Sequence, residues 1–222
     1  IAMMKGGQQA IQEGVPEYEL ALAVISSGTR KAAEFLSPQE DRFYSPIIHN
    51  LQIMQSGHDT CMVHRRSNTR TLKRGDPVYF CMCGMINFKH YKLGFDRTFF
   101  VGSATDDQIQ AYEITINAQK AALDAIRPGA VAEDVHFHAE TVYRDAGYAP
   151  GYRTGRAIGY SFIEKPELKS GDKTVLKEGM TFAVDGGLTV EGKFGTRVGD
   201  SVIVTNTGHE CFTPYSKQLV VI

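Results

Sequence analysis

A single carboxylate, Asp96, stands in the most apolar part of residues 75–102, a stretch that runs GDPVYFCMCGMINFKHYKLGFDRTFFVG. A carboxylate between Phe95 and the TFF run needs a partner or a function, because burying an unpaired charge costs free energy. Arg97 is not the expected partner, since neighbouring residues on a strand point to opposite faces. Asp96 is therefore the first residue of interest, with an ion pair inside the sheet as the alternative.

Two cysteines lie earlier in the same stretch. Cys81 and Cys83 are two residues apart, so on a strand their side chains share a face. Paired thiols suit a soft metal, but nothing nearby in the sequence completes a tetrahedral set. Reduced core thiols are the favoured interpretation, and they indicate a reducing, cytoplasmic compartment.

His64 is a second candidate for chemistry. It lies in SGHDTCMVHRRSN, a polar segment with a glycine that is typical of a loop. A loop histidine in a cleft can move a proton near neutral pH. From the sequence alone, a surface or capping histidine is the favoured interpretation.

The elements that position these residues follow from periodicity. Alternation of apolar residues predicts a hairpin over 75–102, with a turn from 84 to about 90 that is long enough to line a pocket. Helices are expected at 16–36, 105–126 and 132–146, and the opening residues resemble the rear half of another helix. A second hairpin is expected over 179–205 and carries Asp185 in GMTFAVDGG.

These elements form a weak internal repeat. Each half consists of a helix pair followed by a hairpin, and in that register Cys81 is opposite Asp185. The repeat predicts an α+β domain with a pseudo-twofold axis and a central, mainly antiparallel sheet. A pocket is expected where the two hairpins meet.

Composition limits the classes of partner. The chain has 222 residues, of which 42% are hydrophobic, and its net charge is -1. Such a balance gives no reason to expect nucleic acid or an acidic membrane as a partner. No signal peptide or long apolar run is present in the sequence.

Several stretches, in order, resemble the "pita-bread" superfamily of methionine aminopeptidase, aminopeptidase P, prolidase and creatinase. The resemblance implies one pita-bread domain over residues 1–222, an upstream N-terminal domain that this chain lacks, and a homodimer. The matching stretches span nearly the whole chain: EGVPEYEL, SGHDTCMVHRRSNTRTLKRGD, DRTFFVG, AIRPGA, DAGY, TGRAIG, KPEL, LKEGMTFAVDGG and SVIVTNTGHECFT.

The superfamily's peptidases hold two metal ions with two Asp, one His and two Glu. At the five matching positions this chain has one residue able to ligate, Asp185, and an arginine adds positive charge where cations would bind. The resemblance therefore implies no metal and no cofactor. The five matching positions are Cys81, Gly94, Arg156, Asp185 and Gly199.

Creatinase, a metal-free member, matches better. Its proton-transferring histidine matches His64, and its two substrate-binding glutamates match Asp96 and Asp185, which would hold the cationic part of a substrate. Two further creatinase histidines are lost, at Arg156 and Gly199.

The arginines extend this site. Arg156 is expected to bind a substrate carboxylate, or else to neutralise Asp185 in place of metal. Arg197 and Asp200 are expected beside the same cleft, with a solvated pair at a strand end as the alternative.

The resemblance implies a metal-independent hydrolase of the creatinase type. Its small-molecule substrate would be polar, an amidine, a cyclic amidine or an N-acyl amino acid, and the enzyme would cleave a C–N bond. Two alternatives stay open. One is an Xaa-Pro dipeptidase-like protein with a degenerate metal site, and the other is a non-catalytic binding module, as in the peptidase-like domain of a histone chaperone.

Overall fold

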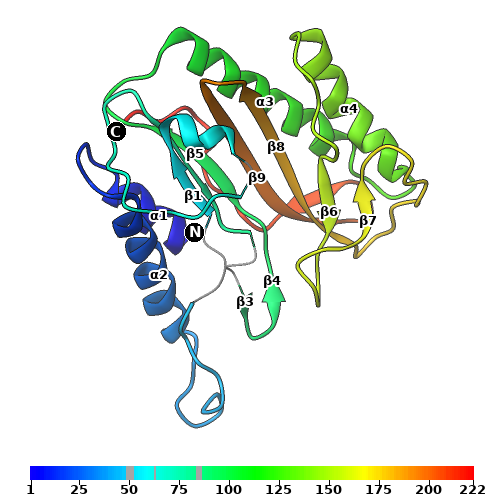
Figure 1. Ribbon diagram of the computed structural model, residues 1–222. Coiled ribbons are helices and arrows are strands. Elements are labelled where there is room, and N and C mark those ends of the chain that lie inside the picture. The colour runs from blue at the N-terminus through cyan, green and yellow to red at the C-terminus, as the bar shows by residue number, and fades with distance from the viewer. Residues whose placement is uncertain (49–52, 63, 84–86) are drawn as a thin grey trace.

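A computed structural model describes residues 1–48, 53–62, 64–83 and 87–222. Its main feature is an eight-stranded sheet in the order β1-β2-β5-β9-β8-β6-β7, with β10 paired to β9 (Figure 1). Every strand pair in it is antiparallel. The strands are β1 (Ile53–Ser56), β2 (Pro77–Cys81), β5 (Asp96–Phe100), β6 (Gly155–Ala157), β7 (Glu164–Leu168), β8 (Thr181–Val190), β9 (Phe194–Val204) and β10 (His209–Cys211).

Helices pack against this sheet. The α+β fold that the sequence predicts is therefore confirmed. A capping box stabilises the start of the helix α3 (Asp106–Ala125). The Thr105 side chain accepts a hydrogen bond from the Gln108 amide, and the Gln108 side chain accepts one from the Thr105 amide. Within the described part of the chain, no helix is long and apolar enough to cross a membrane. The helices are α1 (Ala2–Ala10), α2 (Glu17–Ala33), the short η1 (Gly57–Cys61), α3 (Asp106–Ala125) and α4 (Ala132–Asp145).

The predicted first hairpin exists, with one difference. Its return arm divides into β4 (Tyr91–Lys92), which pairs with β3 (Asn87–Phe88) in a separate ribbon, and β5, which pairs with β2 in the main sheet. Part of the predicted turn, residues 84–86, lies outside the described residues.

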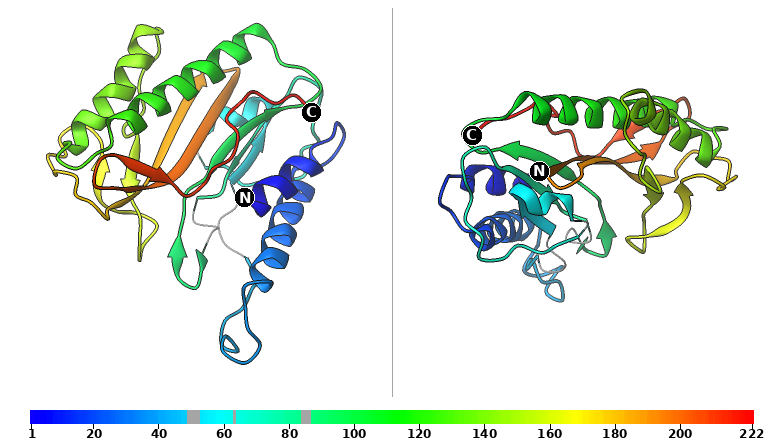
Figure 2. Two further views of the ribbon diagram at one scale, coloured as in Figure 1. Left: turned by 180° about the vertical axis from the view of Figure 1, so that it is seen from behind. Right: turned by 45° about the horizontal axis from the view of Figure 1, so that its top comes forward.

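The two halves of the chain repeat one arrangement, as the sequence predicts. In sheet order β2 and β5 of the first half meet β9 and β8 of the second, and β1 and β6 flank them. The pair α1/α2 lies against the first half and α3/α4 against the second (Figure 2). Equivalent single bridges, Pro16 with Thr71 and Val131 with Val175, fasten the chain just before α2 and α4.

Strand alternation separates the core from the site. Val78 and Phe80 of β2 pack in the cluster that contains α1 and α2, and Phe182 and Val184 of β8 pack in the cluster that contains α3 and α4. The intervening residues on both strands point to the opposite face. The helices therefore cover one face of the sheet and leave the other for polar side chains.

Candidate functional site

One row of paired residues crosses the four central strands and forms the base of the site. Cys81 of β2 pairs with Asp96 of β5, Asp96 with Gly199 of β9, and Gly199 with Asp185 of β8. Residues in register on adjacent strands share a face, so the two carboxylates and the thiol point to the side away from the helices. The predicted register, with Cys81 and Asp185 at equivalent places, is confirmed.

Asp96 is buried and has taken the space beside Gly199. A Cβ atom at Gly199 would lie 2.6 Å from Asp96 Oδ2, so this row has room for a side chain at only one of the two positions. The Cys83 thiol donates a hydrogen bond to Asp96 Oδ1 at 3.4 Å. Burial, reinforced by the charge of Asp185, raises the pKa of the Asp96 carboxyl above its usual range.

Arg156 of β6 holds the centre of the site. Its Nη1 donates to both carboxylate oxygens of Asp185 at 2.8 Å, and its Nη2 donates to Cys83 Sγ at 3.4 Å. Its guanidinium carbon lies 4.3 Å from the centroid of the Phe162 ring. A Cβ at Gly94 would lie 2.7 Å from Ala183 Cβ and 3.3 Å from Nη2, so the guanidinium lies close to that glycine.

A cavity of about 460 Å³ opens above this row. Its lining includes His64, Cys83, Arg156, Asp185 and Arg197, so four of the five predicted site residues meet there, and the fifth, Asp96, lies beneath Cys83. Sequence reasoning had placed Cys83 in the core, and it had no signal for Phe162, which enters from a loop far along the chain.

His64 stands at the cavity as an exposed side chain on a backbone with φ of 64°. This left-handed conformation is uncommon for a residue with a Cβ atom and occurs often at functional sites. Partial burial, and then the positive charges of Arg197 and Arg156, lower the pKa of the imidazole below its usual value, although Asp185 opposes them. The ring is thereby kept neutral at neutral pH and can accept a proton.

Arg197 is the cation of the cavity without a carboxylate of its own. Among the described residues, its guanidinium donates no hydrogen bond, and it lies 5.6 Å from the centroid of the Tyr79 ring. Its backbone is fixed on both sides by Thr98: the Arg197 amide donates to Thr98 Oγ1 at 2.8 Å, and Thr98 Oγ1 donates to the Arg197 carbonyl at 2.9 Å. A rigidly placed, unpaired guanidinium suits an anionic ligand.

Asp200 does not join this site, which corrects the expectation that it flanks the cleft with Arg197. It is completely buried, and Arg97 Nη2 and Lys217 Nζ pair with it at 2.8 and 2.9 Å. The reason is alternation, because Asp200 follows Gly199 and so points to the other face.

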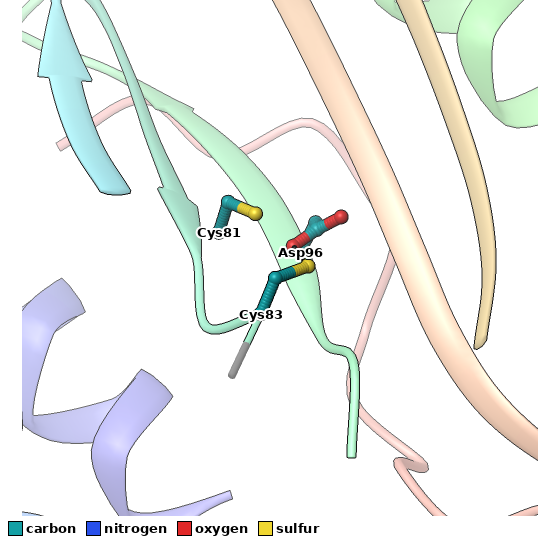
Figure 3. Close-up of side chains that lie close together, drawn as sticks. All are labelled: Cys81, Cys83 and Asp96. Carbon is teal, nitrogen blue, oxygen red and sulfur yellow. Dashed lines mark hydrogen bonds between the residues drawn. The ribbon is translucent and has the colours of Figure 1, made fainter. Parts of the chain in front are cut away.

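The cysteines form a closer group than the sequence indicated. Sγ of Cys81, Sγ of Cys83 and a carboxylate oxygen of Asp96 all lie within 4.8 Å of one another (Figure 3). Asp96 thus adds a third donor from the facing strand, 13 residues beyond Cys83. Three donors do not complete a tetrahedral set, so the sequence-based expectation on that point is not contradicted.

Comparison with known proteins agrees with this geometry. The model of metallopeptidase family M24 matches residues 1–206. The chain belongs to this family. Among solved structures, an Xaa-Pro dipeptidase from Bacillus anthracis superposes with a TM-score of 0.87 at 25% identity, over 100% of this chain and 59% of the other. The prolidase of Pyrococcus horikoshii OT3 gives 0.86 at 25% identity, over 98% and 59%. The predicted pita-bread membership is confirmed.

Two curated relatives differ in what their names describe. The chain is 34% identical over 215 residues to an agropine synthesis cyclase of Rhizobium rhizogenes, which covers 94% of this chain and 53% of the relative. It is 31% identical over 170 residues to an Xaa-Pro dipeptidase of Pyrococcus furiosus, which covers 76% and 48%. The chain thus spans about half the length of these relatives.

The two-metal centre implied by the family's name does not fit these residues. Hard divalent cations need several oxygen or imidazole ligands, and Asp185 is already bound by a guanidinium. Arg156 also places a fixed positive charge above Gly94, one of the five positions matched to ligands. The groups available for chemistry in this cavity are therefore its own side chains.

Proposed function

We propose that this domain is a metal-independent hydrolase that cleaves the C–N bond of a small substrate bearing a carboxylate, such as an N-acyl amino acid. The observation that supports this most is that the two arginines of the cavity differ in their pairing. Arg156 is neutralised by Asp185, whereas Arg197 faces the same cavity and its guanidinium pairs with no carboxylate in the part of the chain that the structure describes.

The same observation makes amidine substrates the weaker choice. A substrate amidinium would need Asp185 or Asp96 as its counter-ion. Asp185 already binds a guanidinium, and Asp96 is 1% exposed beneath Cys83. Arg156 occupies the place that such a ligand would take, so the substrate carboxylate is assigned to Arg197 and the role of Arg156 becomes structural.

His64 supplies the proton transfer. The neutral imidazole takes a proton from water, and the water oxygen attacks the carbonyl carbon to form a tetrahedral intermediate. The C–N bond then breaks, and the imidazolium returns the proton to the leaving nitrogen. The products are a carboxylic acid and an amine. The lowered pKa of His64 supports its role as the base, because the ring is neutral before reaction.

A cyclisation is the second candidate. In it, a hydroxyl or amine of the substrate replaces water as the nucleophile, and His64 keeps the same role. The similarity to a protein named as a cyclase, which extends over 94% of this chain, favours keeping this possibility. The Xaa-Pro dipeptidase interpretation stays open as well, since such a dipeptide also carries a carboxylate. The homodimer and the cytoplasmic location stay predictions.

The test is an assay of the full chain with N-acyl amino acids, Xaa-Pro dipeptides and amidines, with and without a metal chelator. We expect turnover of carboxylate-bearing substrates that the chelator does not reduce. His64→Ala is expected to lower kcat/KM by about 10²–10⁴-fold, the usual contribution of a general base.

His58→Ala is the matched control, because His58 is a nearby, well-exposed histidine that does not line the cavity. It is expected to leave the rate unchanged. An unchanged rate in His64→Ala, or activity abolished by the chelator, would contradict the proposal.

A further inference from the structure

The group formed by Cys81, Cys83 and Asp96 has the geometry of a thiophilic cation site. Cys81 and Asp96 face each other across β2 and β5, and Cys83 follows two residues beyond Cys81 on the same face. All three are buried. Two thiols and a carboxylate are donors that Zn²⁺ accepts, and the thiols select soft cations over hard ones.

The distances need only small changes. With Zn–S near 2.3 Å and Zn–O near 2.1 Å, the S···O edge of a zinc tetrahedron is about 3.6 Å. The observed separation between Cys83 Sγ and Asp96 Oδ1 is 3.4 Å. This separation is close to the length of that edge, and Cys81 Sγ lies within 4.8 Å of Cys83 Sγ and of a carboxylate oxygen of Asp96. Figure 3 shows Cys81 at the end of one strand, Cys83 on the turn that follows it, and Asp96 on the neighbouring strand, with the three side chains close together.

The charges around the group also allow a cation. With both thiols protonated, the formal charges of Asp96, Asp185, Arg156 and Arg197 sum to zero. Binding one divalent cation releases the two thiol protons to solvent, so two thiolates and the metal also add to zero. Arg156 stays compatible, because a metal-bound sulfur still accepts the N–H hydrogen bond that Cys83 Sγ now accepts.

We propose that Cys81, Cys83 and Asp96 bind one thiophilic divalent cation, Zn²⁺ or Cd²⁺, with the fourth coordination position toward the cavity that Cys83 lines. This site differs in donors from the oxygen- and imidazole-rich centre of the family's peptidases. It is independent of the proposed hydrolysis, which needs no metal, and binding is measured without reference to activity.

The experiment is equilibrium dialysis of the tag-free full chain, kept reduced, against Zn²⁺, Cd²⁺, Mn²⁺ or Mg²⁺, with metal counted by mass spectrometry. We expect one equivalent of Zn²⁺ or Cd²⁺ and no retained Mn²⁺ or Mg²⁺. Cd²⁺ should also produce the ultraviolet sulfur-to-metal charge-transfer absorption of a dithiolate site. Retention of no Zn²⁺ or Cd²⁺, or retention without that absorption, would overturn the proposal.

Variants assign the ligands. Cys81→Ser, Cys83→Ser and Asp96→Asn change one donor each with little change in volume, and each is expected to weaken Cd²⁺ binding at least tenfold. Cys211→Ser is the matched control, because Cys211 is a partly buried thiol on β10 outside the group. Equal weakening by Cys211→Ser, or none by Cys81→Ser and Cys83→Ser, would refute the assignment.

A variant could lose cation binding because it does not fold, and a measurement on the wild-type protein avoids this ambiguity. Bound Zn²⁺ stabilises the folded state by mass action, so the wild-type Tm should rise with Zn²⁺ and not with Mg²⁺. A wild-type Tm that responds to neither cation would count against the site, whatever the variants do.

Discussion

The two halves of the sheet use the same scaffold to present opposite chemistry. In the first half, β2 and β5 bring two thiols and a buried carboxylate to the row. In the second half, β6, β8 and β9 bring two guanidinium groups and Asp185. The shared arrangement of helix pair and hairpin determines where the site positions lie, and the residue types then decide what each position does.

The difference shows how a site can keep its geometry while changing its chemistry. In the first half, Asp96 fills the space that Gly199 leaves empty, and in the second half Ala183 and Arg156 fill the space beside Gly94. Each substitution is paired with a glycine, so the two halves interlock across the axis. Experiments that remove one member of a pair therefore test the comparison directly.

The largest effect on stability is expected from Arg156→Ala. The change leaves Asp185 without a counter-ion and removes a donor from Cys83. Breaking a fully buried ion pair typically costs about 3–5 kcal/mol of unfolding free energy, and this pair should lie at the lower end because the Asp185 side chain is 19% exposed. Urea unfolding of the full chain measures it.

Arg144→Ala is the control for that measurement. Arg144 forms an exposed pair with Glu140 one helical turn away, and such pairs contribute about 0–1 kcal/mol. If both variants lost the same stability, the second half would not depend on a buried ion pair.

A smaller effect is expected from Gly199→Ala, which tests how the halves interlock. The new Cβ would lie 2.6 Å from Asp96 Oδ2, and overpacking of this kind costs about 1–3 kcal/mol. Combining it with Asp96→Ala removes the carboxylate at 2.6 and 3.0 Å and leaves only the Asp96 Cβ position at 3.1 Å, so the double variant should lose less stability than the sum of the single variants. A double-mutant cycle with additive effects would show that the two positions do not compete for space.

The smallest effect concerns the pKa of His64. Arg197 is the stronger of the charges that lower it, so Arg197→Gln should raise that pKa toward the usual value. NMR titration of the His64 ring without substrate measures this shift. Arg153→Gln should give a smaller shift in the same direction, because Arg153 contributes least among the groups acting on His64. A larger shift in Arg153→Gln than in Arg197→Gln would contradict this order.

The lowered pKa of His64 sets the direction in which activity and stability change with pH. In the wild type, the neutral base is lost only as the pH falls through the lowered pKa of His64, so activity should persist below the usual imidazole range. The unfolded chain, with its ordinary imidazole, binds more protons in that range, so the free energy of unfolding also falls with acid.

Much of the fold could be predicted because its causes are local. Period-two alternation marked β2 and β8, and the spacing of apolar residues over 105–126 marked α3. The same alternation explains the error at Asp200. A one-residue step reverses the face, and sequence distance from Arg197 does not show that reversal.

The row across the sheet could be predicted in part. The repeat placed Cys81 and Asp185 at equivalent positions, because identical supersecondary units put equivalent residues at the same depth. The partners could not be predicted. Asp185 is 29 residues from Arg156, and Cys83 is 73 residues from it. The pairing of β6 with β8 brings Asp185 to Arg156, and the meeting of the two halves of the sheet brings Cys83 there.

The residue types and their spacing therefore determined the identity of the elements and the α+β architecture. Tertiary structure decided which charges neutralise one another. It paired Arg156 with Asp185, left Arg197 without a carboxylate partner among the described residues, and placed Asp96 beside two thiols. The reason is physical: electrostatic and hydrogen-bond energies depend on distances of a few ångströms across strands, and those distances exist only once the two halves have met.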